Sequence, residues 1–83
     1  MKQLLRRILA ESVQLNVRAD ALSDDADLYA AGLESIATVH LMLAIEEHFD
    51  VEIPDALLTR QLFSSIDSMA DAIAWLQQQK VTT

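Results

Sequence analysis

The only glycine in the chain, Gly32, stands three residues before Ser35, and Ser35 opens an apolar segment with helical spacing. This arrangement places a hydroxyl group where a loop becomes a helix. A serine at such a junction is commonly an N-cap, because its hydroxyl accepts a hydrogen bond from an amide of the first turn. The position also suits a phosphate ester, since free backbone amides and the positive end of the helix dipole favour negative charge. Both interpretations of Ser35 are open at this point.

Apolar residues repeat at helical spacing in three segments, and no segment alternates with the period of a strand. The first helix is expected to end near Asn16, and its buried face comprises Leu4, Leu5, Ile8, Leu9, Ser12 and Val13. The second is expected over 35–49. The last follows the pair Ser64 and Ser65, either of which is a suitable N-cap. These helices indicate an all-α fold.

Two segments connect the three predicted helices. The first covers about 17–34, and its length is unusual for a loop without structure of its own. Its apolar anchors are Val17, Leu22, Leu28 and Leu33. Pro54 ends the second helical region, and a short helix is expected over about 56–62. The prediction is a four-helix bundle with a long first loop and a short third helix, formed by one domain over 1–83.

The second helix has two apolar stripes, although a small domain can direct only one of them to its core. One stripe contains Leu41, Met42, Ile45 and Phe49. The opposite stripe contains Ile36, Val39 and Leu43, and it is flanked by His40, Glu46 and Glu47. An apolar strip edged with carboxylates is typical of a docking surface. The alternative is that the last helix or the long loop covers this strip.

Composition excludes several classes of function. The chain has 83 residues and no cysteine, so a deep substrate cavity is unexpected, and disulfides, thiolate metal sites and a cysteine nucleophile are excluded. The net charge is −7, and no lysine or arginine occurs between Arg18 and Arg60. Such an acidic surface disfavours nucleic acid and suits a basic partner. Neither a signal peptide nor a membrane span is recognisable, which predicts a cytoplasmic protein without membrane insertion.

No metal or catalytic constellation is evident. A calcium loop beginning at Asp25 fails, because its glycine position is Ala30 and its twelfth position is Ile36. His40 and His48 lack the spacing of a helical zinc pair. The side chains of Ser35 and His40 diverge by roughly 140° on a helix, which disfavours a local dyad.

The ordered motifs along the chain resemble those of the acyl carrier protein family, which includes aminoacyl and peptidyl carriers. The attachment motif of that family, Gly-x-Asp-Ser-Leu, corresponds to Gly32-Leu33-Glu34-Ser35-Ile36. Asp27-Leu28-Tyr29 precedes it, and Ala44-Ile45-Glu46-Glu47-His48-Phe49, Val51-Glu52-Ile53-Pro54 and Ile66-Asp67-Ser68-Met69-Ala70 follow in order. The resemblance extends from about Leu4 to Leu76.

The resemblance implies that a phosphopantetheinyl transferase joins the 4′-phosphopantetheine of coenzyme A to Ser35. The thiol of this arm then holds an acyl or aminoacyl group as a thioester, so the chain is a carrier and not an enzyme. A ligase and downstream transferases or synthases are the implied partners of a monomeric carrier. The implied partner-recognition residues are Glu34, Ile36, Val39, His40, Leu43, Glu46 and Glu47.

The sequence differs from the family pattern at positions that indicate in which biosynthetic pathway the carrier acts. Ala37 and His40 stand where carriers of fatty acid synthesis usually have acids, and 57–63 is less acidic than their third-helix region. These differences favour a free-standing carrier that a dedicated ligase charges with an amino acid, or a carrier of secondary metabolism, over bulk fatty acid synthesis.

Two other functions are open on the sequence. The chain could be an unmodified helical interaction module that binds a partner helix through the strip on its second helix. A small acid–base enzyme using His40 with Glu47 is a weaker alternative, since so short a chain provides little pocket.

Overall fold

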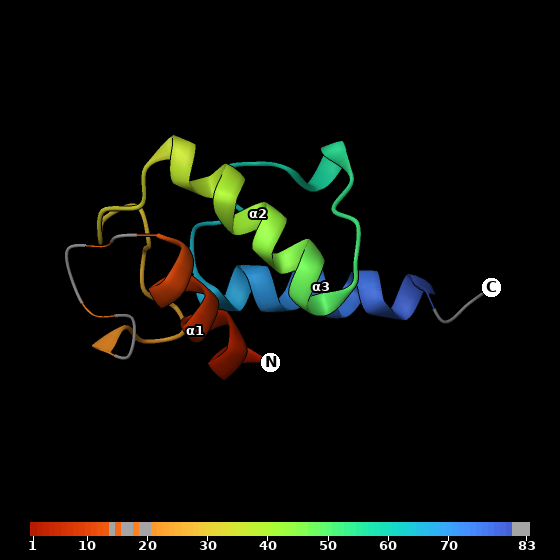
Figure 1. Cartoon of the computed structure of the whole chain (residues 1–83), viewed down its shortest axis with the longest axis horizontal. Coiled ribbons are helices and arrows are strands. Elements are labelled where there is room, and N and C mark those ends of the chain that lie inside the picture. The colour runs from red at the N-terminus through yellow and green to blue at the C-terminus, as the bar shows by residue number, and fades with distance from the viewer. Residues whose placement is uncertain (14, 16–17, 19–20, 81–83) are drawn as a thin grey trace.

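The structure describes residues 1–13, 15, 18 and 21–80 of the computed structural model, and three α-helices and the short 3₁₀ helix η2 lie within them. The helices are α1 (Lys2–Ser12), α2 (Ser35–Phe49), η2 (Asp55–Leu57) and α3 (Ile66–Lys80), and these residues include no strand. Helix α2 crosses over α3, and α1 packs against both (Figure 1). The predicted all-α fold with a short third helix is confirmed, and η2 takes the place of that third helix.

Helix α1 buries Leu5, Ile8 and Leu9, as the spacing of its apolar residues predicts. It ends at Ser12, so the expected end near Asn16 is wrong, and Asn16 itself lies outside the described residues. The physical reason is the conformation of Val13, which is extended (φ −137°, ψ 157°). A β-branched side chain favours that conformation.

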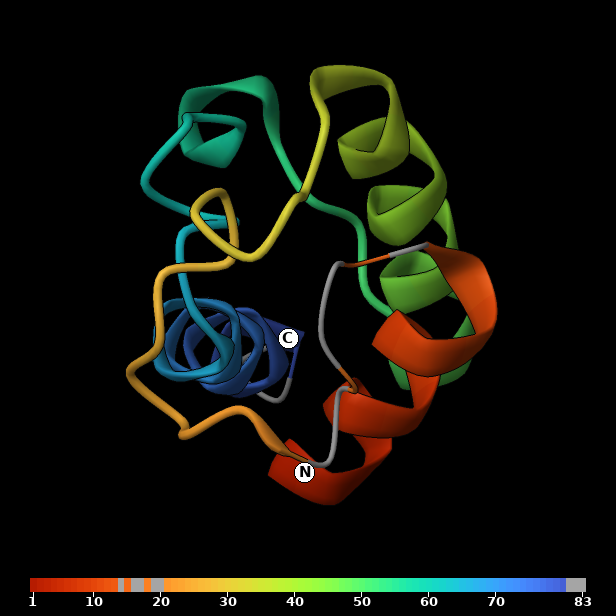
Figure 2. The same ribbon diagram turned by 90° about the vertical axis from the view of Figure 1, so that its left-hand side faces the viewer.

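The connection between α1 and α2 is anchored where the apolar pattern indicates. Leu28 and Leu33 are buried and Leu22 is partly buried against the same core, whereas Val17 lies outside the described residues. The amide of Leu28 donates a hydrogen bond to the carbonyl of Ser64 (2.8 Å). The loop is therefore fixed to the segment that leads into α3 (Figure 2).

An ionic cluster joins the beginning of α1 to the same loop and to α3. The ammonium of Lys2 lies 2.7 Å from a carboxylate oxygen of Asp67 and 3.7 Å from one of Asp24. Arg6 donates to Asp24 and to the carbonyl of Leu22. The hydrogen bond and the charge of Asp67, with a smaller effect of Asp24, raise the pKa of Lys2 above 10.5.

Helix α2 has the predicted bounds. The first stripe faces the core, with Leu41 and Ile45 buried and Met42 and Phe49 partly buried. Asp50 follows in a left-handed conformation (φ 53°), which reverses the chain at the end of the helix. The opposite stripe remains exposed, so neither α3 nor the long loop covers it.

The region after Pro54 is less helical than predicted. The expected helix over 56–62 is replaced by the single 3₁₀ turn of η2, and the chain continues through turns to Ser64. Pro54 (φ −71°) starts the turn, and its carbonyl accepts from Leu57 (2.9 Å). Leu58 leaves helical geometry at ψ 74°, which ends the element. The segment contributes Leu62 and Phe63 to the core.

Helix α3 begins at Ile66 with Ser65 as its N-cap. The hydroxyl of Ser65 accepts a hydrogen bond from the amide of Ser68 (3.0 Å), which is the usual capping interaction. The amide of Asp67 donates to the carbonyl of Asp24 (2.9 Å). The expectation that Ser64 or Ser65 caps the last helix is confirmed.

The buried apolar side chains of all these elements form a common core. Its members are Leu5, Ile8, Leu9, Leu28, Leu33, Leu41, Ile45, Val51, Ile53, Leu62, Phe63, Ile66, Met69, Ala70, Ile73 and Leu76. The helices of the described residues are too short, or too polar, to cross a membrane.

Candidate functional site: the beginning of helix α2

The chain turns into α2 at Gly32, whose φ of 110° is strained for any residue with a side chain. The amides of Gly32 and Leu33 donate to the carbonyls of Tyr29 (3.1 Å) and Leu28 (3.0 Å), which closes the turn. The unique glycine therefore fixes the direction in which the chain enters the helix.

Ser35 is the first helical residue and not the N-cap. Glu34 is the N-cap, with extended backbone angles and no capping hydrogen bond from its side chain. The carbonyl of Glu34 accepts from the amides of Ala37 (3.0 Å) and Thr38 (3.3 Å). The interpretation of Ser35 as a helix cap is therefore wrong, because its hydroxyl lies one position too far along the chain.

The hydroxyl of Ser35 is exposed and forms no hydrogen bond with the described residues. Its backbone carbonyl accepts from the hydroxyl of Thr38 (2.5 Å). The amides of Ser35 and Ile36 likewise have no partner among the described residues. An exposed nucleophilic oxygen therefore stands beside free amide donors at the positive end of the helix dipole.

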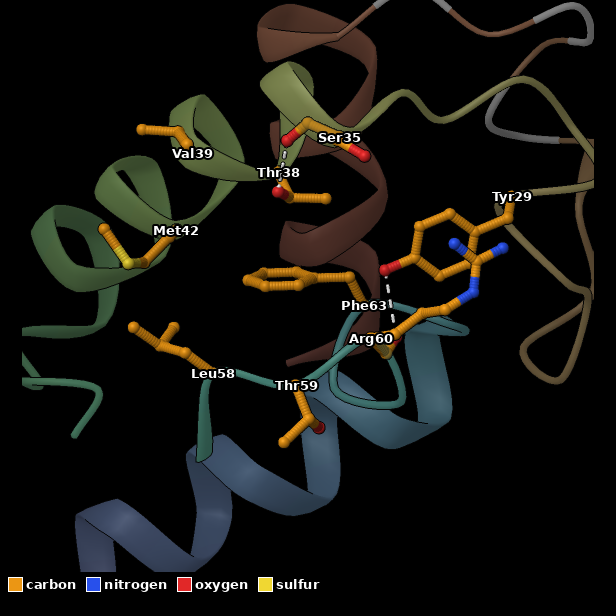
Figure 3. A pocket seen from close by; sticks show the side chains of 9 residues that line it. All are labelled: Tyr29, Ser35, Thr38, Val39, Met42, Leu58, Thr59, Arg60 and Phe63. Carbon is orange, nitrogen blue, oxygen red and sulfur yellow. Dashed lines mark hydrogen bonds between the residues drawn. The ribbon is translucent and has the colours of Figure 1, made fainter. Parts of the chain in front are cut away.

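A pocket of about 330 Å³ opens beside Ser35 (Figure 3). Thr38, Val39 and Met42 of α2 form one side of it. The other side comes from the loop before α2 and from the segment after η2, which contribute Tyr29, Leu58, Thr59, Arg60 and Phe63. Apolar side chains line much of the pocket, and no aspartate or glutamate lines it.

Tyr29 and Arg60 hold each other at one side of this pocket. The phenol hydroxyl of Tyr29 donates to the backbone carbonyl of Arg60 (2.9 Å). The guanidinium carbon of Arg60 lies 3.9 Å from the centroid of the Tyr29 ring, within cation–π distance. Figure 3 shows the Ser35 hydroxyl projecting toward the side of the pocket that these two residues form.

The strip predicted on α2 lies on the surface beside Ser35. Ile36, Val39 and Leu43 are 70%, 51% and 54% exposed. Glu34, His40 and Glu47 are also exposed. These side chains share one continuous face that extends from the first turn of α2 toward its end.

Glu46 differs from the other predicted members of this strip. Its side chain is partly buried, and its carboxylate accepts a hydrogen bond from the amide of Ile53 (2.9 Å). The same residue accepts from the amide of Val51 through its carbonyl (3.3 Å). Glu46 therefore stabilises the segment after α2, whatever contacts it makes with a partner.

Tyr29 and Arg60 were not predicted as site residues. Arg60 did carry a signal, because it is the only lysine or arginine between Arg18 and Lys80, a stretch that contains every acidic residue except Glu11. Its approach to Tyr29 depends on the tertiary fold. No three histidine or acidic side chains of the described residues are grouped so that they could hold a metal ion.

The fold and the site define a class: a small helical carrier bundle that offers a free serine hydroxyl at the beginning of its second helix. The family defined by a phosphopantetheine attachment site matches residues 3–73. The chain belongs to this family, the acyl carrier proteins. It is therefore a carrier of phosphopantetheine-bound thioesters for partner enzymes, and not itself an enzyme.

Several individual carrier proteins are similar to this chain. The chain is 52% identical over 73 residues to the aminoacyl carrier protein of Agrobacterium fabrum, covering 88% of each chain. It is 51% identical to a carrier protein from Agrobacterium tumefaciens, solved with an engineered glycine:[carrier protein] ligase from Bradyrhizobium japonicum and AMP (TM-score 0.86; 89% of this chain and 99% of that one). A structure of the Bradyrhizobium japonicum ligase with glycylated carrier protein matches at 31% identity (TM-score 0.64; 86% and 90%).

Proposed function

We propose that Ser35 receives the 4′-phosphopantetheine arm and that the cargo of the arm is an amino acid. The observation that carries the first part is the state of the Ser35 hydroxyl, which is exposed and takes no part in capping α2. A serine at a helix start normally contributes a cap. Here the cap position belongs to Glu34, which leaves the Ser35 oxygen available to a modifying enzyme.

The surroundings of Ser35 suit a phosphodiester. The amides of Ser35 and Ile36 are free to donate to phosphate oxygens, and the helix dipole favours the added negative charge. The arm contributes a terminal thiol, to which the cargo is joined as a thioester. The protein then needs no cysteine of its own, in agreement with its composition.

An amino acid is the cargo class that the comparisons support. The relative at 52% identity is named an aminoacyl carrier protein, and a carrier at 51% identity was solved with a glycine:[carrier protein] ligase. We propose that a ligase of this kind activates a small amino acid with ATP and transfers it to the arm thiol. Glycine is the first candidate.

We further propose that partner enzymes dock on the exposed face of α2. The residues concerned are Glu34, Ile36, Val39, His40, Leu43, Glu46 and Glu47. Apolar side chains at the centre with charged ones around them are typical of interaction surfaces. This face adjoins Ser35, so a docked enzyme would have its active site near the arm. We also propose that residues 1–83 form one domain, which acts as a monomer in the cytoplasm.

The experiment proceeds in two stages. The purified chain is incubated with coenzyme A and a broad-specificity phosphopantetheinyl transferase, and its intact mass is measured. The modified protein is then incubated with the glycine:[carrier protein] ligase, ATP and single amino acids. We expect a second mass increase equal to one aminoacyl group, which hydroxylamine removes because it is a thioester.

Three outcomes are informative. Loading with glycine or another small amino acid supports the proposal. Modification at Ser35 followed by loading only with fatty acyl groups from an acyl ligase would contradict the aminoacyl cargo. Absence of any adduct would favour the unmodified interaction module, for which the α2 face would be the binding surface.

A further inference from the structure

We propose that Arg60, held on the ring of Tyr29, binds the phosphodiester of the arm and positions the arm along the pocket beside Ser35. This inference rests on the proposed attachment of the arm to Ser35. It assigns a positioning role to a residue outside α2, in the turn that follows η2.

Charge supplies the first argument. Arg60 is the only lysine or arginine of residues 19–79, whereas 12 of the 13 acidic residues fall in that range. This single cation lines the same pocket as Ser35, and no carboxylate lines it. A phosphodiester on Ser35 is an anion on an acidic protein, and Arg60 is the only lysine or arginine among the residues that line the pocket.

The state of the Arg60 side chain supplies the second argument. Arg60 forms no ion pair among the described residues, whereas Lys2, Arg6 and Arg7 are all paired with acidic side chains. Its guanidinium carbon lies over the Tyr29 ring, 3.9 Å from the centroid. The N–H donors at the edge of the plane remain available, and they match the geometry of phosphate oxygens.

Preorganisation supplies the third argument. Tyr29 is itself fixed, because the carboxylate of Asp27 accepts from the amides of Tyr29 (3.0 Å) and Ala30 (3.4 Å). Tyr29 then fixes both ends of Arg60, its carbonyl through the phenol hydroxyl and its guanidinium through the ring. A side chain that is already restrained loses less conformational entropy when it binds a ligand.

The geometry of the pocket connects these observations. In Figure 3 the hydroxyl of Ser35 projects toward the Tyr29 and Arg60 side, while Met42, Leu58 and Phe63 line the apolar part of the pocket. A phosphate bound by Arg60 would direct the rest of the arm along the pocket beside Ser35. Its apolar portion could then lie against the neighbouring apolar side chains.

The test uses phosphopantetheinylated protein and the variants Arg60→Gln, Arg60→Lys and Tyr29→Leu. Arg7→Gln is the matched control, because Arg7 is an exposed arginine on α1. Intact mass first establishes that each protein carries one arm at Ser35. The phosphorus NMR shift of the phosphodiester and the Arg60 Nε–Hε resonance are then recorded, with the urea-unfolded protein as the reference for a free arm.

We expect the phosphorus shift of the parent to differ from the unfolded reference, and the Arg60 Nε–Hε resonance to move when the arm is attached. Arg60→Gln should move the phosphorus shift toward the reference value. Arg60→Lys should restore part of the difference, Tyr29→Leu should reduce it, and Arg7→Gln should leave it unchanged. The difference in phosphorus shift between the parent and Arg60→Gln should decline between about 0.1 M and 1 M salt, because the Debye length falls from about 10 Å to about 3 Å.

An arm at Ser35 whose phosphorus shift is the same in the parent and in Arg60→Gln would overturn the role of Arg60 while leaving the carrier function intact. Failure to attach the arm at Ser35 would appear earlier, in the mass spectrum, and would overturn both proposals. A melting temperature for each variant close to that of the parent establishes that the shifts report the arm and not unfolding.

Discussion

Glu34 and Ser35 divide two roles at the beginning of α2: Glu34 occupies the N-cap position, and Ser35 begins the helix with a hydroxyl that bonds to none of the described residues. Attachment of a group to the Ser35 oxygen would therefore break no capping hydrogen bond of α2. The oxygen that we propose as the attachment point and the N-cap of α2 therefore belong to different residues.

The first prediction compares two serines at helix starts. Ser35→Ala should change the free energy of unfolding by less than about 0.5 kcal/mol, because no capping bond is lost. Ser65→Ala should reduce it by about 1 kcal/mol, because the hydroxyl of Ser65 accepts from the amide of Ser68. Urea unfolding of the unmodified proteins measures both. A larger loss for Ser35→Ala than for Ser65→Ala would mean that Ser35 has a capping role.

The second prediction concerns the exposed face of α2. Leu43→Ala should raise the KM of the ligase for the carrier by roughly tenfold, equivalent to about 1.4 kcal/mol, if Leu43 is a central contact. Trp75→Ala is the control, because Trp75 is 52% exposed on α3 and Leu43 is 54% exposed on α2. Steady-state loading with varied carrier concentration measures the effect. Equal KM values for the two variants would place the docking surface elsewhere.

The third prediction separates two properties of Glu46. Glu46→Gln removes the charge but retains an oxygen that can accept from the amide of Ile53, so stability should remain close to that of the parent. Glu46→Ala removes the acceptor and should cost about 1 kcal/mol. Unfolding curves distinguish the variants, and Glu47→Gln serves as an exposed control. A destabilised Glu46→Gln would show that the charge itself matters to the fold.

The fourth prediction concerns alkaline pH. Asp67 and Asp24 raise the pKa of Lys2 in the folded protein above its ordinary 10.5, so the folded state binds the proton more tightly than the unfolded state. The stabilisation is therefore complete below the unfolded pKa and is lost as pH rises through the folded pKa. The stability difference between the parent and Lys2→Met should be constant from pH 7 to about 9.5 and should decline above 10.5.

Lys2→Arg is the control for this pH effect, since arginine keeps its charge throughout the range. Above pH 10.5 the parent should lose its extra free energy of unfolding over Lys2→Met, whereas Lys2→Arg should retain its own. A difference between parent and Lys2→Met that does not change above pH 10.5 would mean that Lys2 contributes by packing and not by charge.

The sequence predicted the parts of the fold that local chemistry determines. Gly32 and Pro54 bracket α2, and the bounds of that helix were predicted correctly. The end of α1 and the length of the third helix were not, because Val13 and Leu58 adopt non-helical geometry that apolar spacing does not reveal. The sequence left open whether Ser35 caps the helix, since a shift of one residue along the helix start leaves the sequence pattern unchanged, and the structure places Glu34 at the cap.

The pocket beside Ser35 lay beyond sequence analysis for another reason. Tyr29 and Arg60 are separated by 31 residues, and only the packing of the loop against the segment after η2 brings them together. The unusual position of Arg60 as a lone cation was visible in the sequence, but its partner was not. Long-range pairs of this kind are determined by tertiary structure.

The measurement that tests the account most directly is the intact mass of the parent, Ser35→Ala and Ser64→Ala after incubation with coenzyme A and a broad-specificity phosphopantetheinyl transferase. Ser64→Ala is the control for the loss of a serine that lies outside α2. We predict one phosphopantetheine adduct on the parent and on Ser64→Ala, and none on Ser35→Ala. An adduct that persists on Ser35→Ala, or a parent that remains unmodified, would contradict the assignment of Ser35 as the attachment residue.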